Sequence, residues 1–139
     1  MPISNFPFSD IGDGFARPFL LTKIVNPLNG NHVLCFGLVD TGADDCSVPA
    51  SIAKSLGHDL QAGRQKEIGT GNGMSIAYAH TARFEILHPI SKKTLYILQD
   101  TPVDFMPNLP LVLLGTQNFL SHFILTIDYP RKTFSIKYP

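Results

Sequence analysis

Short apolar runs separated by polar turn residues make up most of the 139-residue chain. Apolar residues 19–25 and 32–39 flank the stretch Asn-Pro-Leu-Asn-Gly-Asn at 26–31, whose composition is typical of a hairpin turn. From 76 to 86, mostly large apolar residues at even positions alternate with alanine or polar residues at odd positions, and this period of two predicts a long strand. We therefore expect a mostly-β chain, with further strands at 94–99, 111–115, 123–128 and 133–138.

The segments between these strands predict turns, a loop and little helix. Residues 49–57 predict a short helix that begins at Ser47 or Pro49 and ends at Gly57. Residues 116–121 predict one or two helical turns. The glycine-rich run 68–74 leads into a strand and predicts the tip of a hairpin. Residues 100–110 hold three prolines and predict an ordered loop.

Composition narrows the class of protein. The length fits one domain, 1–139, and 44% hydrophobic residues with 16% charged residues indicate a globular chain. Eleven basic residues balance eleven acidic ones, so nothing attracts nucleic acid or an anionic membrane over long range. No apolar run approaches the ~20 residues of a membrane span, and residues 1–8 lack the features of a signal peptide. Two cysteines, Cys35 and Cys46, fit a reducing compartment, and we expect a cytoplasmic protein.

Asp40-Thr41-Gly42 is the strongest candidate for chemistry, because an apolar strand runs directly into it. Hydrolysis of a peptide by carboxylates uses one water held between two aspartates that share a proton. The chain has a single Asp-Thr-Gly, so this chemistry would need a homodimer with one site on its two-fold axis. Asp-x-Gly is also ordinary turn chemistry, and the tripeptide alone does not decide between the two interpretations.

Four segments in order give the tripeptide its context. They are Arg17-Pro18, Asp-Thr-Gly-Ala-Asp-Asp at 40–45, the glycine-rich hairpin at 68–73, and Pro-Leu-Val-Leu-Leu-Gly at 110–115. With these segments the chain resembles the retropepsins, the dimeric aspartic proteases of retroviruses and their cellular and bacterial relatives, over about residues 15–138. The resemblance implies a single-domain retropepsin-like (acid protease) β-barrel with one or two short helices, which forms a homodimer.

The resemblance also implies roles for individual residues. Asp40, Thr41 and Gly42 would be catalytic. Thr41 would also form hydrogen bonds with the partner subunit. Arg17 would contact the acidic residue at Asp44 of the partner subunit. The substrate would be a polypeptide, with no cofactor and no metal, and none of the five histidines has metal-ligand spacing. The substrate-binding set would be Gly42, Ala43, Asp44, Asp45, Gly69, Thr70, Gly71, Asn72, Gly73, Leu111 and Leu113.

Some of these roles have plainer alternatives. Asp44 and Asp45 could be carboxylates that only cap the loop, and Leu111 and Leu113 could belong to the core. The chain also departs from the retroviral pattern. Thr116-Gln117 follows Gly115 where retroviral enzymes have Arg-Asn, so the ion pair of that Arg with Asp44 is missing or rebuilt. Gly71 replaces a β-branched residue at the hairpin tip, which predicts a more flexible tip or a weaker contact across the dimer.

Two functions from different classes follow. The first is an aspartic endopeptidase that cuts an extended peptide by means of a water activated by two Asp40 carboxylates, one from each subunit. The second is a catalytically weak or inactive peptide-binding or scaffolding module that keeps the fold. The intact Asp40-Thr41-Gly42 favours the first, and the altered hairpin tip and the missing Arg leave room for the second. A weakly associating monomer, active only when dimerised or fused, is a third possibility.

Overall fold

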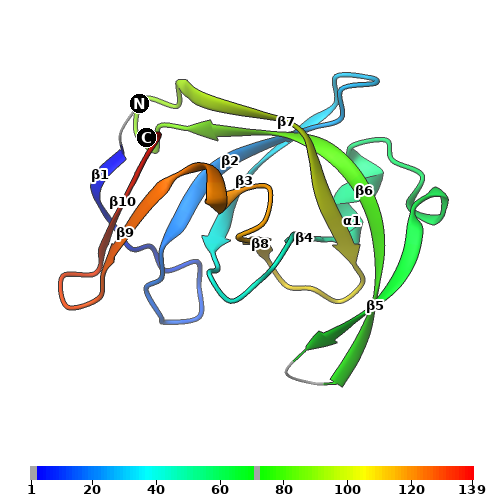
Figure 1. Cartoon of the computed structure of the whole chain (residues 1–139), viewed down its shortest axis with the longest axis horizontal. Coiled ribbons are helices and arrows are strands. Elements are labelled where there is room, and N and C mark those ends of the chain that lie inside the picture. Colours follow the sequence, from blue (N-terminus) through cyan, green and yellow to red (C-terminus); the bar gives the residue numbers. More distant parts are fainter. Residues whose placement is uncertain (1–2, 71–72) are drawn as a thin grey trace.

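Two sheets make up the fold in the computed structural model, which describes residues 3–70 and 73–139 (Figure 1). The helical elements are few and short: α1 (Ala50–Ser55), η1 (Leu60–Ala62) and η2 (Leu120–His122). The strands are β1 (Ile3–Pro7), β2 (Phe19–Val25), β3 (His32–Val39), β4 (Cys46–Pro49), β5 (Arg64–Thr70), β6 (Gly73–Leu87), β7 (Thr94–Met106), β8 (Val112–Leu114), β9 (Ile124–Asp128) and β10 (Thr133–Lys137).

The larger sheet has the strand order β2-β3-β8-β4-β7-β6-β5, and β2 also pairs with β6. This extra pairing closes the sheet on itself, so the strands form a small barrel. β3 runs parallel to β8 and β4 runs parallel to β7, while the long strands β5, β6 and β7 are antiparallel neighbours. The predicted mostly-β barrel with short helices is therefore confirmed.

The smaller sheet joins the two ends of the chain. β1 pairs with β10, and β10 pairs with β9, so the described N-terminal strand lies beside the C-terminal one (Figure 1). Phe134 and Ile136 of β10 turn inward and are buried. Outer strands β1 and β9 each leave one edge without a partner strand among the described residues.

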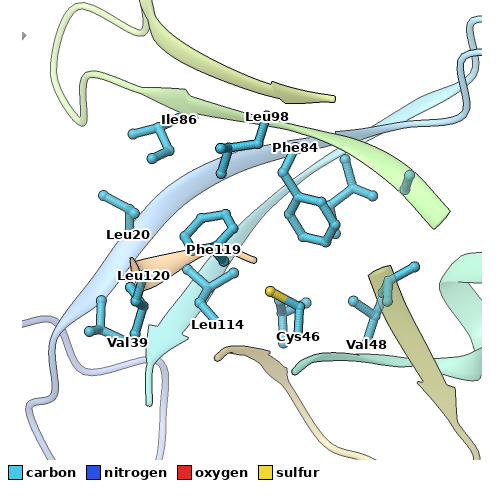
Figure 2. Packing of buried hydrophobic residues seen from close by; sticks show 14 of the residues in the cluster. Leu20, Val39, Cys46, Val48, Phe84, Ile86, Leu98, Leu114, Phe119 and Leu120 are labelled. Carbon is cyan, nitrogen blue, oxygen red and sulfur yellow. The ribbon is translucent and has the colours of Figure 1, made fainter. Parts of the chain in front are cut away.

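The core of the barrel is a continuous apolar cluster in which side chains from β2, β3, β4, β6 and β8 meet (Figure 2). Phe84 and Phe119 lie at its centre, edge to face, with ring centroids 5.6 Å apart. Leu114 packs beside them, and Gly37 leaves it room, because a Cβ at Gly37 would lie 2.7 Å from Leu114 Cγ. Cys46 is also buried in this cluster, and burial raises the pKa of its thiol to about 12.

Several predicted boundaries differ from the structure. The strands at 19–25 and 32–39 are confirmed, but the predicted helix is shorter, because residues 46–49 form β4 before α1 begins. The loop expected at 100–110 is wrong for residues 100–106, which continue β7 and pair with both β6 and β4. A proline is tolerated in a strand at a position that needs no N–H donor, and Pro102 occupies such a place opposite Thr81.

None of the helices in the described part of the chain is long and apolar enough to cross a membrane.

Candidate active site

The loop at residues 40–45, here called the Asp40 loop, follows β3 directly. The backbone N–H of Asp40 donates to the carbonyl of Leu114 at 3.0 Å, which ties the start of the loop to β8. One carboxylate oxygen of Asp40 accepts the N–H of Gly42 at 3.0 Å, and its carbonyl accepts the N–H of Ala43 at 3.2 Å. These bonds fold the loop into a tight turn and hold the half-buried Asp40 carboxylate in one orientation.

Residues after β8 support the far side of the Asp40 loop. Thr116 donates to the carbonyl of Ala43 twice, from its backbone N–H at 2.9 Å and from its hydroxyl at 3.1 Å. The N–H of Gln117 donates to the carbonyl of Asp44 at 2.7 Å. Gly115 makes this approach possible, because a Cβ there would lie 2.4 Å from the carbonyl oxygen of Asp45. Among the described residues Asp44 thus has no ion pair, and Thr116 and Gln117 hold the loop through the backbone carbonyls of Ala43 and Asp44 instead.

A pocket of about 740 Å³ opens beside the Asp40 loop, under the hairpin formed by β5 and β6. Figure 1 shows this hairpin projecting from the barrel on the side where the loops after β3 and β7 lie. The described residues that line the pocket come from the Asp40 loop, β4, β5, β7 and β8: Asp40, Gly42, Ala43, Asp44, Asp45, Ser47, Lys66, Glu67, Ile68, Gly69, Asp104, Met106, Leu109 and Leu113.

The structure brings together much of the site that the sequence predicted. The Asp40 loop, Gly69 and Leu113 meet in one pocket, although β8 lies some seventy residues beyond Asp40 in the chain. Thr41 is exposed beside the pocket, and Leu111 and Gly73 do not line it within the described ranges. Nothing is described of the Thr70 side chain, and Gly71 and Asn72 lie outside the described residues.

Arg17 lies away from this pocket. It lines a second hollow with Pro18 and Leu38, and its guanidinium pairs with Asp13 of the same chain at 2.5 Å. The Arg17 pair lowers the pKa of the Asp13 carboxyl. Both side chains are well exposed, so solvent screens this ion pair strongly and another acid could replace Asp13.

Sequence reasoning missed part of the pocket wall, chiefly Ser47, Lys66 and Asp104. Lys66 Nζ lies 2.9 Å from a carboxylate oxygen of Asp104 and 3.7 Å from one of Asp45. Asp104 is 4% exposed, and burial raises the pKa of its carboxyl although Lys66 acts in the opposite direction. The sequence feature that could have indicated a buried acid at Asp104 is its place inside the apolar run Val-Asp-Phe-Met at 103–106. Because a loop was predicted there, an inward-facing Asp104 was not expected.

Within residues 3–70 and 73–139, no group of three or more histidine, cysteine, aspartate or glutamate side chains could hold a metal ion. The chemistry that the pocket itself offers is that of carboxylates. Asp40 is the one that a rigid turn presents beside apolar walls, with Gly69 of the β5–β6 hairpin also lining the pocket. Such an arrangement suits acid and base catalysis on a substrate that lies between the loop and the hairpin.

Comparison with known proteins places these features in a wider context. A family model described as "Aspartyl protease" matches residues 28–117, which is well over half of the chain. No sequence among the curated proteins matches the chain. The crystal structure of a retropepsin-like aspartic protease from Rickettsia conorii is similar in fold, with a TM-score of 0.62 and 22% sequence identity. The alignment covers 97% of this chain and 99% of that chain.

Proposed function

Because this chain belongs to the aspartyl protease family, we propose that it is an endopeptidase whose active site forms between two identical subunits. Each subunit supplies one Asp40, and the two carboxylates hold the water that attacks the peptide bond. The observation that carries the proposal is the position of Asp40, which a tight turn presents in the pocket beneath the β5–β6 hairpin. The family itself supports protease function in general, and the dimeric mechanism is our inference.

Two carboxylates at close range divide the work by sharing one proton. Like charges a few ångströms apart cannot both ionise easily, so the pair titrates in two steps. The ionised carboxylate takes a proton from the water while the protonated one polarises the carbonyl of the substrate. The water's oxygen bonds to the carbonyl carbon, and the amine then leaves with a proton returned from the pair. No covalent intermediate with the protein forms.

The other acids of the pocket are poor substitutes for a second Asp40. Asp104 is buried and bonded to Lys66 at 2.9 Å, and Asp45 lies 3.7 Å from the same ammonium. The ammonium of Lys66 beside these two carboxylates would compete with a catalytic water for their oxygens. The twin of Asp40 therefore comes from a second subunit, as the single Asp-Thr-Gly requires.

The substrate would bind as an extended strand between the Asp40 loop and the β5–β6 hairpin, which would act as a flap. In this arrangement Gly42, Ala43, Asp44 and Asp45 bind the backbone of the peptide from below. The flap residues 69–73 cover it from above. Leu113 lines the pocket together with Met106 and Leu109, which favours an apolar substrate side chain next to the cleaved bond.

Contacts between subunits would use residues that are exposed or easily released in one chain. Thr41 is exposed beside Asp40 and can bond to its counterpart across the two-fold axis. Arg17 can exchange the exposed Asp13 for Asp44 of the partner subunit at little cost in free energy.

The proposal is tested by incubating a diverse peptide library with the wild-type protein and with Asp40→Asn, and reading the products by mass spectrometry. Wild type should cut internal peptide bonds, and Asp40→Asn should lose at least about a thousandfold in rate because it removes the ionisable pair. Circular dichroism should show the same fold in both proteins. Equal turnover by the two proteins would refute the role of Asp40. Binding of peptides by both proteins without cleavage by either would instead support the peptide-binding module.

A further inference from the structure

The charges of this protein are distributed unevenly. The whole chain is neutral, with eleven basic and eleven acidic residues. The lining of the pocket beside Asp40 is not, because it includes five carboxylates and a single ammonium group, Lys66. The carboxylates are those of Asp40, Asp44, Asp45, Glu67 and Asp104.

An ion pair between a buried carboxylate and a partly exposed ammonium lies in the wall of this pocket. Strand register places Lys66 opposite Ala77 and Ala79 opposite Asp104, so all four side chains lie on the same face of the sheet. The two alanines are small, and the stem of Lys66 crosses them to bring its ammonium within 2.9 Å of Asp104. A cation from β5 is thus held two strands away, against β7, on the wall that the substrate would contact.

Asp104 differs from an ordinary surface acid. Only 4% of the residue is exposed, and a buried carboxylate is unfavourable unless a cation or hydrogen-bond donors stabilise it. Ser47 of β4 lies opposite Asp104 in the parallel ladder and lines the same pocket. This part of the wall is therefore polar, in contrast to the apolar part formed by Met106 and Leu113.

The ion pair leaves one negative charge uncompensated. Lys66 is bonded closely to Asp104 but lies 3.7 Å from Asp45, beyond direct hydrogen-bond distance. Three charges then follow one another along the wall: Asp104, Lys66 and Asp45. A second cation placed against Asp45 would complete an alternating row of two acids and two bases, while a second anion would meet the net negative charge of the pocket.

We propose that Lys66, Asp104 and Asp45 form a specificity-determining subsite that selects peptide substrates with a lysine or arginine side chain near the cleaved bond. Asp45 contacts the basic side chain, and the Lys66–Asp104 pair sets the net charge beside it. This inference rests on the proposed function for the identity of the ligand. In a symmetric dimer the subsite is present on both sides of the cleaved bond.

The test measures binding as well as cleavage. The probes are fluorescein-labelled eight-residue peptides of otherwise apolar sequence, each with one lysine, norleucine or glutamate at a chosen position. Norleucine keeps the apolar stem of lysine and removes its charge. Fluorescence anisotropy with the Asp40→Asn protein gives affinities without turnover. The cleavage rates of the same peptides are measured with proteins that retain Asp40. We expect the best lysine peptide to be preferred about tenfold over its norleucine match, and glutamate to bind most weakly.

Two substitutions should move this preference in opposite directions. In Lys66→Met the wall loses its only ammonium, so the preference for lysine over norleucine should increase. In Asp104→Asn the freed Lys66 can pair with Asp45, so the preference should fall to near unity. Lys93→Met and Asp100→Asn, at exposed positions, serve as matched controls and should leave the preference unchanged. A merely structural role for the pair would lower binding of all three peptides equally.

The outcomes separate this inference from the proposed function. Preferential binding of lysine peptides without any cleavage would overturn the protease and support the subsite. Cleavage with equal use of lysine and norleucine would overturn the subsite and leave the protease standing. A lysine preference that neither Lys66→Met nor Asp104→Asn changes would also overturn the subsite.

Discussion

The hydroxyl of Thr116 donates a hydrogen bond to the carbonyl of Ala43 at 3.1 Å, and the backbone N–H of Thr116 donates to the same oxygen at 2.9 Å. These two hydrogen bonds fix the Asp40 loop to the segment after β8. Thr116 stands where the retroviral pattern has an Arg, and its contact with the loop uses neutral groups in place of an ion pair. The orientation of Asp40 therefore depends on a short-range contact that salt does not screen.

Thr116→Ala should destabilise the protein by about 1 kcal/mol, because one hydrogen bond to the carbonyl of Ala43 is lost. It should lower kcat more than KM, since a looser Asp40 loop holds the carboxylate less well. Urea unfolding and peptide-cleavage kinetics measure the two effects. Thr116→Ser keeps the hydroxyl and is the matched control. Equal behaviour of the Ala and Ser variants would contradict a role for the hydroxyl.

Gly115→Ala should be far more damaging. Its Cβ would lie 2.4 Å from the carbonyl oxygen of Asp45 and 2.5 Å from the carbonyl carbon, and backbone cannot move aside as the end of a side chain can. We expect a loss of about 3 kcal/mol or failure to fold. Gly69→Ala, whose Cβ would meet nothing within 4 Å, should change the free energy of unfolding by less than about 0.5 kcal/mol. A mild effect of Gly115→Ala in thermal unfolding would show that the loops do not pack this closely.

The pH dependence of stability reports on Asp104. Burial raises the pKa of its carboxyl above the ordinary 3.8, while Lys66 and Arg64 lower it and Asp45 raises it further. The folded chain thus binds this proton more tightly than the unfolded chain, and the resulting stabilisation is present below about pH 4 and lost as pH rises through the folded pKa. Asp104→Asn resembles the protonated form and has no such loss.

The stability of Asp104→Asn relative to wild type should therefore increase between about pH 3 and pH 7. Urea midpoints measured across this range test the prediction, with the exposed Asp100→Asn as control. A relative stability that falls with rising pH would mean that the Lys66–Asp104 pair outweighs the cost of burying the carboxylate.

Local patterns made much of the fold predictable. The apolar runs at 19–25 and 32–39 and the turn between them have the same bounds in the structure, because a hairpin depends on neighbouring residues. β1 was not predicted, since its partner β10 lies about 130 residues away and the five residues of β1 carry no strong alternation. β4 was not predicted either, because four residues are too few to show a period.

The sequence predicted those residues of the candidate site that belong to a motif. It did not predict the residues that only strand register brings to the pocket. Asp40 to Asp45, Gly69 and Leu113 belong to recognisable segments, and they meet in the pocket. Lys66 and Asp104 meet because β5, β6 and β7 pair in one particular register, which the sequence does not reveal. The prolines in residues 100–110 predicted a loop, and that prediction removed Asp104 from consideration.

The central claim is that each active site contains two Asp40 carboxylates from different subunits. It is tested most directly by mixing wild type with Asp40→Asn at constant total protein, allowing subunits to exchange, and measuring the rate of peptide cleavage. If only wild-type pairs are active, the rate follows the square of the wild-type fraction, so an equal mixture retains about one quarter of the full rate. A rate that falls linearly, to about one half in the equal mixture, would mean that one Asp40 suffices and would contradict the shared site.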